Sequence, residues 1–402
     1  MNNSDRISTQ PLASQPVTVA DRPAADLMLD IPPGSTGPSG RTSDAAPDSY
    51  GQADAGEPCS VTTLKSIGPA RWDEYVRGHP EGSFFHLDGW REAVKASFGH
   101  RDDYLVARRG DRIVGVLPMF LVKSMASGRM LVSVPYGVGG GILADDKFAA
   151  SDLLEAAKDL ARDDRAGVID FRSSKAAVAE LPVVDRYVGF RRELPGSSSD
   201  VLGWLPRKAR AAARNARNKY GLTVSFGDDH LQDVWRMYSL SMRRLGSLNY
   251  PRAFFRNLIE RSLNHHMVSI VHRRGEPVAG LLSFMFNRTV MPYFIGTTDQ
   301  ARTCSAANFI YLTLMQRAVD EGYRTFDFGR SRRDNKGSFD FKRFCGFSPE
   351  PLEYQYYTPP GRTPPDLTPG NPRVRLVREI WKRLPLGVTR PAGAYLARHL
   401  PG

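Results

Sequence analysis

Alternating apolar and polar positions predict two β-hairpins that lie far apart in the chain. The first pattern, DYLVARRGDRIVGVLPMF at 103–120, has two β-branched runs around a Gly-Asp turn. The second, HMVSIVHRRGEPVAGLLSFMF at 266–286, has the same form with its turn at Gly275 to Pro277. After each hairpin the pattern predicts a third strand, a helix, a short strand, a short helix and a final strand.

The two units also match residue by residue, which indicates a duplicated domain. Residues 106–120 align without a gap on residues 271–285, an offset of 165. Two later dipeptides match at an offset of 157, namely Asp170-Phe171 with Asp327-Phe328 and Gly189-Phe190 with Gly346-Phe347. Because duplicated domains rarely keep the same task, residues present in only one copy mark candidate chemistry.

These patterns predict an α+β fold of two tandem domains in a chain of 402 residues. Domain one is expected at 58–200. A linker helix and domain two, the active half, are expected at 201–358. Residues 1–57 are rich in Ser, Pro, Gly and Asp and are expected to be a disordered tail, and 359–402 form a Pro-rich linker and a basic amphipathic segment.

Targeting and cysteine signals point to the cytoplasm. The N-terminus has no apolar core behind a basic start, and no run reaches the roughly 18 to 20 apolar residues of a membrane-spanning helix. Cys59, Cys304 and Cys345 form no CxxC pair and no metal-like spacing with histidine. We therefore expect a soluble or peripheral cytoplasmic protein with no metal and no bound cofactor.

The charge balance predicts an anionic partner, since the net charge is +12 and the isoelectric point is near 9.7. In the predicted linker helix, Arg207, Arg210, Arg214 and Arg217 recur at helical spacing on one face. This face is either a solvated surface or a binding strip for a polyanionic donor or acceptor, with Arg210 and Arg214 as contacts. DNA binding is not expected, because no recognisable reading motif accompanies these cations.

The C-terminal segment has a second basic pattern. Apolar side chains at 374, 377, 380, 381 and 384 alternate with arginine and lysine over residues 373–384. Such a helix can lie on an anionic bilayer, here the inner membrane, or dock back on the fold. The sequence leaves both open.

Residues 325–357 form the densest candidate for chemistry. A strand ends at Gly329, and Arg330, Arg332, Arg333 and Lys336 follow around the flexible Gly337. Clustered cations in a loop at a strand end suit phosphate or carboxylate oxygens.

The repeat strengthens this prediction for the following helix. At the offset of 157, Lys342 falls opposite Asp185 and Gly329 opposite Arg172, and the Arg-rich loop has no counterpart of similar charge. We therefore expect the reacting groups to lie in domain two. The alternative is that Lys342 is a surface lysine on a packed helix.

These residues also carry a family resemblance. The order of elements resembles two tandem GNAT acyltransferase domains, and DFGRS followed by GSFDFKRFCGF and LEYQYY is similar to the C-terminal signature of FemAB-type transferases. The resemblance covers about residues 60–358 and extends to the branch associated with exosortase and exopolysaccharide loci in Gram-negative bacteria. It implies transfer of an acyl or aminoacyl group to an amine, as FemAB members extend peptidoglycan side chains from aminoacyl-tRNA.

The same resemblance implies roles for individual residues. Phe341 and Lys342 stand where the family has a Phe-Lys pair at the reacting centre, and a lysine ammonium there stabilises an oxyanion or the leaving group. Asp327 would orient a donor or accept a proton, or else be a buried structural carboxylate. The implied substrate contacts are Arg330, Ser331, Arg332, Arg333, Lys336, Gly337, Tyr293 and Asn308.

Donor and acceptor stay open at this stage. The stretch TTDQARTCSAANF lacks the RxxGxG-type loop by which ordinary GNAT enzymes hold acyl-CoA, and no long coiled-coil arm of the kind found in some tRNA-using relatives is present. The co-substrate is thus acyl-CoA or aminoacyl-tRNA, and the acceptor an amine-bearing envelope precursor. The alternatives are an acyl-CoA-dependent N-acyltransferase acting on a polysaccharide sugar, and a non-catalytic module that binds carbohydrate or nucleotide-sugar.

Overall fold

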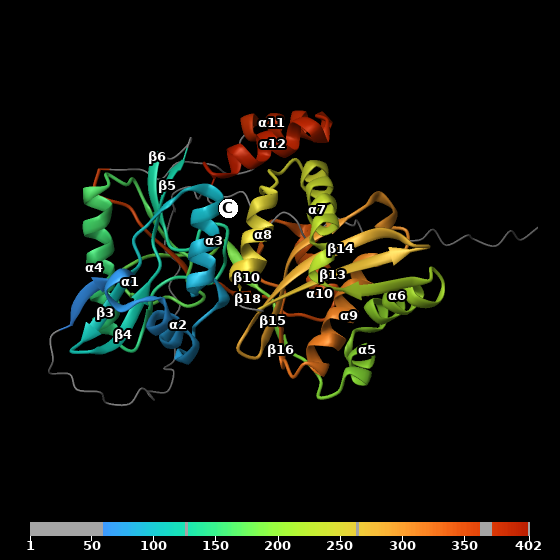
Figure 1. Cartoon of the computed structure of the whole chain (residues 1–402), viewed down its shortest axis with the longest axis horizontal. Helices are drawn as coiled ribbons and strands as arrows, with labels where there is room; N and C mark the ends of the chain where they lie inside the picture. Colours follow the sequence, from blue (N-terminus) through green and yellow to red (C-terminus); the bar gives the residue numbers. More distant parts are fainter. Residues whose placement is uncertain (1–58, 125–127, 263–264, 362–371, 401–402) are drawn as a thin grey trace, which may run out of the picture.

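The computed structural model describes residues 59–124, 128–262, 265–361 and 372–400. The expected N-terminal tail and the Pro-rich linker lie almost wholly outside these ranges. Two α+β halves stand side by side, and a pair of C-terminal helices lies along one edge of the molecule (Figure 1).

The first half begins with a short strand and several helices, and most of its strands form two sheets. Its helices are α1 (Leu64–Ile67), α2 (Pro69–Gly78), η1 (Phe84–His86), α3 (Asp88–Phe98) and α4 (Lys147–Asp163). Its strands are β1 (Ser60–Thr63), β2 (Arg101–Asp102), β3 (Leu105–Arg109), β4 (Arg112–Leu117), β5 (Phe120–Ser124), β6 (Gly128–Val132), β7 (Leu143–Ala144), β8 (Ile169–Phe171), β9 (Val183–Val184), β10 (Tyr187–Gly189) and β11 (Arg191–Glu193).

The second half is built around one six-stranded sheet. Its helices are η2 (Ser198–Asp200), α5 (Val201–Trp204), α6 (Arg207–Asn218), η3 (Asp228–His230), α7 (Leu231–Leu245), α8 (Arg252–Arg261), η4 (Asp299–Ala301), α9 (Ala306–Asp320) and α10 (Lys336–Phe344). Its strands are β12 (Leu222–Phe226), β13 (His266–Arg273), β14 (Glu276–Phe286), β15 (Thr289–Thr297), β16 (Thr325–Asp327), β17 (Ser331–Arg332), β18 (Glu350–Pro351) and β19 (Tyr354–Tyr357). The chain ends in α11 (Pro372–Arg383) and α12 (Leu386–Ala397).

The predicted repeat is present in three dimensions. The two hairpins are β3–β4 and β13–β14, both antiparallel, and the predicted linker helix is α6. In both halves the strand after the helix joins the sheet in parallel, through β6–β8 and β15–β16. The α+β tandem fold expected from the sequence is therefore confirmed.

The two halves exchange their closing strands. The central sheet of the second half has the order β11-β16-β15-β14-β13-β12, so its outer strand β11 comes from the end of the first repeat. In the first half the order is β2-β5-β6-β8-β19-β9, and β19 comes from the end of the second repeat. A small sheet, β17-β10-β18, also joins segments from both repeats. Each half thus depends on the other for a complete sheet.

The expected short helix of the first repeat is absent, and the prediction of a helix in both copies was wrong. The described residues between β8 and β9 run as an irregular segment around the side chain of Gln355, which is buried on the exchanged strand β19. Its Oε1 accepts from the backbone N–H of Ala177 at 3.1 Å, and its Nε2 donates to the carbonyls of Val178 and Leu181 at 2.6 and 3.0 Å. Because this amide satisfies the backbone groups, the segment needs no helical hydrogen bonds.

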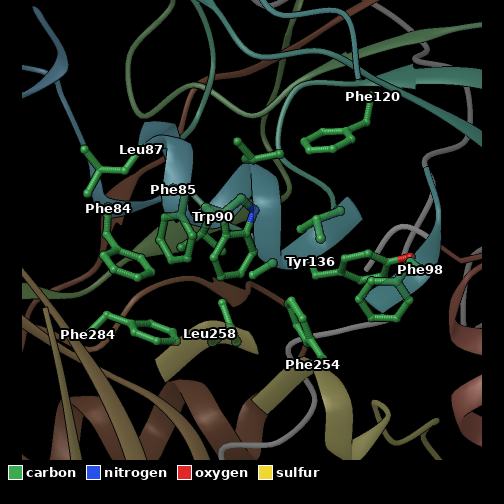
Figure 2. Close-up of a cluster of buried hydrophobic side chains, with 14 of the residues drawn as sticks. Phe84, Phe85, Leu87, Trp90, Phe98, Phe120, Tyr136, Phe254, Leu258 and Phe284 are labelled. Carbon is green, nitrogen blue, oxygen red and sulfur yellow. The ribbon is translucent and has the colours of Figure 1, made fainter. Parts of the chain in front are cut away.

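Aromatic side chains from both halves form one core between them. Phe84, Phe85 and Trp90 of the first half face Phe254 and Phe284 of the second half (Figure 2). The Phe84 and Phe284 rings stack with centroids 4.3 Å apart, and Trp90 meets Phe254 edge to face at 5.7 Å. Such pairs add to the stability that apolar burial supplies.

Close packing of α7 on the second sheet depends on two glycines. Gly280 of β14 and Gly296 of β15 are cross-strand partners, and α7 crosses both. A Cβ at Gly296 would lie 2.1 Å from the backbone nitrogen of Tyr238, so the helix could stay in place only without a side chain there.

We expect Gly296→Ala to lower the free energy of unfolding by about 1–3 kcal/mol, because the new methyl group meets rigid helix backbone. Urea unfolding followed by circular dichroism measures this change. The matched control is Gly203→Ala in α5, where an added Cβ has no atom within 4 Å. A Gly296→Ala midpoint equal to that of the control would contradict the close approach of α7.

Candidate active site

Lys342 lies inside the protein on α10, not on its surface. Its side chain is 1% exposed, and its ammonium nitrogen donates to the carbonyl oxygens of Gly329 at 3.1 Å and Arg330 at 2.9 Å. Nζ also stands 5.2 Å from the centre of the Phe190 ring, which belongs to the first repeat. The alternative of a surface lysine is therefore wrong.

Burial changes the protonation of this lysine. Loss of hydration lowers the pKa of Lys342 from 10.5 to about 7; the carboxylate of Asp327 opposes the shift, and the nearby Arg330 guanidinium adds to it. The amine form is thus much more accessible near neutral pH than it is for an exposed lysine.

Asp327 ends β16 and shapes the turn that Lys342 holds. Its Oδ1 accepts from the backbone N–H of Gly329 at 2.7 Å. Burial raises the pKa of Asp327, and the Gly329 hydrogen bond together with the charges of Arg191 and Lys342 limits the rise. Gly329 has φ +65°, a left-handed conformation that glycine adopts without strain. Asp327 and Lys342 therefore fix opposite sides of one turn.

The turn directs Arg330 into the junction between the halves. Arg330 is buried, its Nη1 donates to the Tyr354 hydroxyl at 3.3 Å, and its guanidinium carbon lies 4.7 Å from the centre of the Tyr187 ring. Tyr187 belongs to β10 and Tyr354 to the exchanged strand β19. This contact exists only because the repeats exchange strands.

The residue in the first half that corresponds to Arg330 is Arg172, which the sequence interpretation missed as a site residue. It is buried, its Nε pairs with Asp170 at 3.0 Å, and its Nη1 donates to the carbonyls of Val134 and Gly137. The available signal was DFRS at 170–173 against DFGRS at 327–331, which align if one glycine is inserted. Without this inserted glycine, the constant offset of 157 places Gly329 opposite Arg172.

Tyr293 lies in the same junction. Its hydroxyl donates to the backbone carbonyl of Tyr136 at 2.5 Å, and burial raises its pKa. Tyr136 and Tyr293 each follow a proline and stand 157 residues apart, so they occupy equivalent positions in the two repeats. The Tyr293 hydroxyl thereby joins the repeats.

Other candidates of the Arg-rich loop divide between buried and exposed positions. Ser331 is buried and shares a 2.9 Å hydrogen bond with the Ser338 hydroxyl. Arg332 pairs with Asp334, and Arg333 pairs with Asp185 of the first half at 2.7 Å. Lys336 is exposed at the start of α10, with Gly337 partly exposed next to it. Of the cations, only Arg330 and Lys342 lie in the interior.

The remaining candidates surround this centre at different depths. Phe341 is partly exposed and packs on Tyr311, with ring centres 5.6 Å apart. Asn308, near the start of α9, has a buried Nδ2 with no hydrogen-bond partner among the described residues. Arg210 donates to the carbonyls of Gly203 and Leu205.

Arg214 points into solvent from α6 together with four further cations of the same region, Arg207, Lys208, Arg217 and Lys219. The start of α6 lies beside the end of α10, because a Cβ at Gly346 would stand 2.8 Å from the Pro206 ring. The exposed face of α6 therefore begins next to the helix that carries Lys342.

Strands β15 and β16 separate near this centre. They pair in parallel only through Thr289 and Val290, after which β15 continues to Thr297. No described strand pairs with that side of β15 beyond Val290. At the end of this edge, the backbone N–H and carbonyl of Thr297 are bound by Ser241 and Arg244 of α7. The part of the edge before Thr297 can form main-chain hydrogen bonds with an extended ligand.

Neither a metal cluster nor a membrane-spanning helix is found in the described ranges. No group of three or more His, Cys, Asp or Glu side chains there could hold a metal ion. The helices of these ranges are all too short or too polar to cross a bilayer.

Comparisons with known proteins agree with this architecture. Residues 206–343 match the family model described as an acetyltransferase (GNAT) domain. No curated protein matches the chain. Among solved structures, FemX has a TM-score of 0.56 at 15% identity, covering 74% of this chain and 97% of FemX.

Two further structures are more distant. A tandem GNAT protein from the clavulanic acid biosynthesis pathway has a TM-score of 0.49 at 12% identity, covering 75% of this chain and 98% of its own. L-PGS from Bacillus licheniformis has a TM-score of 0.46 at 13% identity, covering 79% and 98%.

The matched domain model covers α6 to α10, the part that holds Lys342, and the similarity to FemX extends over both halves. Residues 206–343 therefore form a GNAT-type domain, and the similarity to FemX shows that the two halves together share the fold of that protein.

Proposed function

We propose that this protein transfers an acyl or aminoacyl group to an amine of a cell-envelope or exopolysaccharide precursor. The observation that carries the proposal is the buried Lys342, held on the turn after β16 inside the GNAT domain. Burial of a cation in a preorganised polar site is a common way to stabilise negative charge that develops during a reaction.

In the proposed reaction, the amine attacks the carbonyl carbon of the donor's thioester or ester. A C–N bond forms and the carbonyl oxygen gains negative charge. Collapse of the intermediate breaks the C–S or C–O bond, and the proton lost by the amine passes to the departing sulfur or oxygen, which leaves as a thiol or an alcohol. An ammonium has three N–H donors, and two of those on Lys342 bind Gly329 and Arg330. The third stabilises the oxyanion or the leaving group, with Phe341 beside it and Asp327 orienting the turn.

The donor is an anionic carrier, either acyl-CoA or aminoacyl-tRNA, and both are made in the cytoplasm. The unpaired edge of β15 and the free Nδ2 of Asn308 support an extended donor with amide and phosphate groups. Arg214 and the other exposed cations of α6 support a longer polyanion. Arg332, Arg333 and Lys336 surround the same turn and suit the phosphates of an anionic acceptor.

A second candidate is an acyl-CoA-dependent N-acyltransferase that acts on a polysaccharide sugar, which the acetyltransferase domain match favours. A non-catalytic module that binds carbohydrate or nucleotide-sugar would share the fold without transfer. Assays of the pure protein with acyl-CoA and with charged tRNA, on amino-sugar and peptide acceptors, distinguish these three candidate functions.

We expect Lys342→Met to lower kcat by about 10²–10³, the loss typical of removing one oxyanion donor, while circular dichroism stays unchanged. The matched control is Arg343→Ala, which removes the exposed neighbouring cation and should keep full activity. The ratio of wild-type to Lys342→Met kcat should fall as pH rises through about 7, because the wild-type ammonium is then lost. Equal loss in both variants, or wild-type protein without transfer from either donor, would refute the assignment.

The same pKa predicts how stability depends on pH. Between about pH 7 and 10.5 the unfolded chain keeps the Lys342 proton while the folded chain has released it, so raising the pH favours the folded state. The unfolding free energy of wild type minus that of Lys342→Met should therefore rise with pH over this interval. Urea titrations at pH 7, 8 and 9 measure it, and a pH-independent difference would mean that Lys342 is hydrated in solution.

A further inference from the structure

Exposed apolar side chains are concentrated on the two C-terminal helices. The described residues include seven exposed large hydrophobic side chains, and five of them lie on α11 and α12. These five are 48% to 63% exposed and are Leu376, Val377, Ile380, Val388 and Tyr395. A cluster of this kind on an otherwise polar surface usually marks an interaction site.

The helices are nevertheless docked on the protein by their other faces. Trp381 of α11 is buried, and Arg378 donates to the carbonyl of Leu245 at the end of α7. In α12, the carbonyl of Ala397 accepts from the buried Tyr136 hydroxyl at 3.1 Å. The C-terminal helices lie along the edge of the molecule (Figure 1). One face of each helix packs on the protein and another is exposed, so docking on the fold does not prevent contact with a bilayer.

The outward side chains are grouped by helical geometry. Leu376, Val377 and Ile380 fall within an arc of about 100° on α11, next to the arc that carries Trp381. Val388 and Tyr395 are seven residues apart on α12 and share one face. Each helix therefore presents a continuous apolar strip.

Positive charge accompanies these strips. Residues 372–402 contain seven Lys and Arg against the single acid Glu379, a net charge of +6. Arg383 and Arg398 are exposed beside the apolar side chains. Two copies of this chain would repel each other through such surfaces, whereas an anionic lipid headgroup layer would attract them.

We propose that α11 and α12 together form a membrane-docking surface for an anionic phospholipid bilayer, with Leu376, Val377 and Ile380 entering the headgroup and acyl boundary. The helices stay docked on α7 while they bind, so the active half is held at the bilayer surface. This inference rests on exposure and charge and does not depend on the proposed transfer reaction.

Vesicle flotation tests the proposal with the full chain. Wild-type protein should bind vesicles of mixed phosphatidylglycerol and phosphatidylcholine, should bind pure phosphatidylcholine at least tenfold more weakly, and should lose affinity as salt is raised. The triple variant L376S/V377S/I380S should bind anionic vesicles at least tenfold more weakly than wild type. The matched control is Phe148→Ser on α4, whose side chain is 59% exposed on another part of the surface, and it should bind like wild type.

Each variant is also examined by thermal unfolding, which detects misfolding, and by gel filtration, which detects self-association. If the triple variant is misfolded, Ile380→Ser alone replaces it, with at least a threefold loss expected. Three results would each overturn the proposal: wild-type protein that does not bind anionic vesicles, a folded serine variant that binds like wild type, or an equal loss of binding in Phe148→Ser. The transfer assay is unaffected by these outcomes, so failure here leaves the proposed function standing.

Discussion

The reciprocal exchange of β11 and β19 is the constraint on which the rest of the structure depends. Backbone groups at a sheet edge need partners, and here each half supplies the partner of the other, through Arg191 opposite Asp327 and Gln355 opposite Phe171. The Gln355 side chain hydrogen-bonds to the backbone of the first half at Val178, and the Tyr354 hydroxyl accepts a hydrogen bond from the Arg330 guanidinium. Neither half has a complete sheet without the other, and the aromatic core between them adds apolar burial to the same interface.

The two sibling sequences also reach different local chemistry. In the first half, Asp170 pairs directly with Arg172. In the second half one inserted glycine turns the chain, so Asp327 binds the Gly329 amide and the arginine moves to the tyrosines of the junction. Lys342 then occupies the space behind the turn. Burial of its ammonium is unfavourable, and the two carbonyls and the Asp327 carboxylate offset part of that cost.

The second half and the C-terminal helices are joined through α7. This helix crosses β14 and β15 at two glycines, and its C-terminal end, at Leu245 and Gly246, contacts Arg378 of α11. Under the two proposals made above, a lipid-binding surface and the sheet next to the proposed reacting groups would move as one body.

The sequence by itself determined the repeat, the hairpins and the α6 helix, because periodicity and turn residues are local properties of the chain. The candidate roles of the DFGRS and Phe-Lys segments came from the family resemblance. The burial of Lys342 could not be predicted, since α10 carries alternating charges and only the packing of Phe190 and the turn at Gly329 removes this lysine from water. Tertiary structure alone decided the strand exchange, the missing helix around Gln355 and the pairing of Tyr136 with Tyr293. Each of these joins residues more than 130 positions apart, and sequence patterns carry no information about which of two equivalent sheets a closing strand will enter.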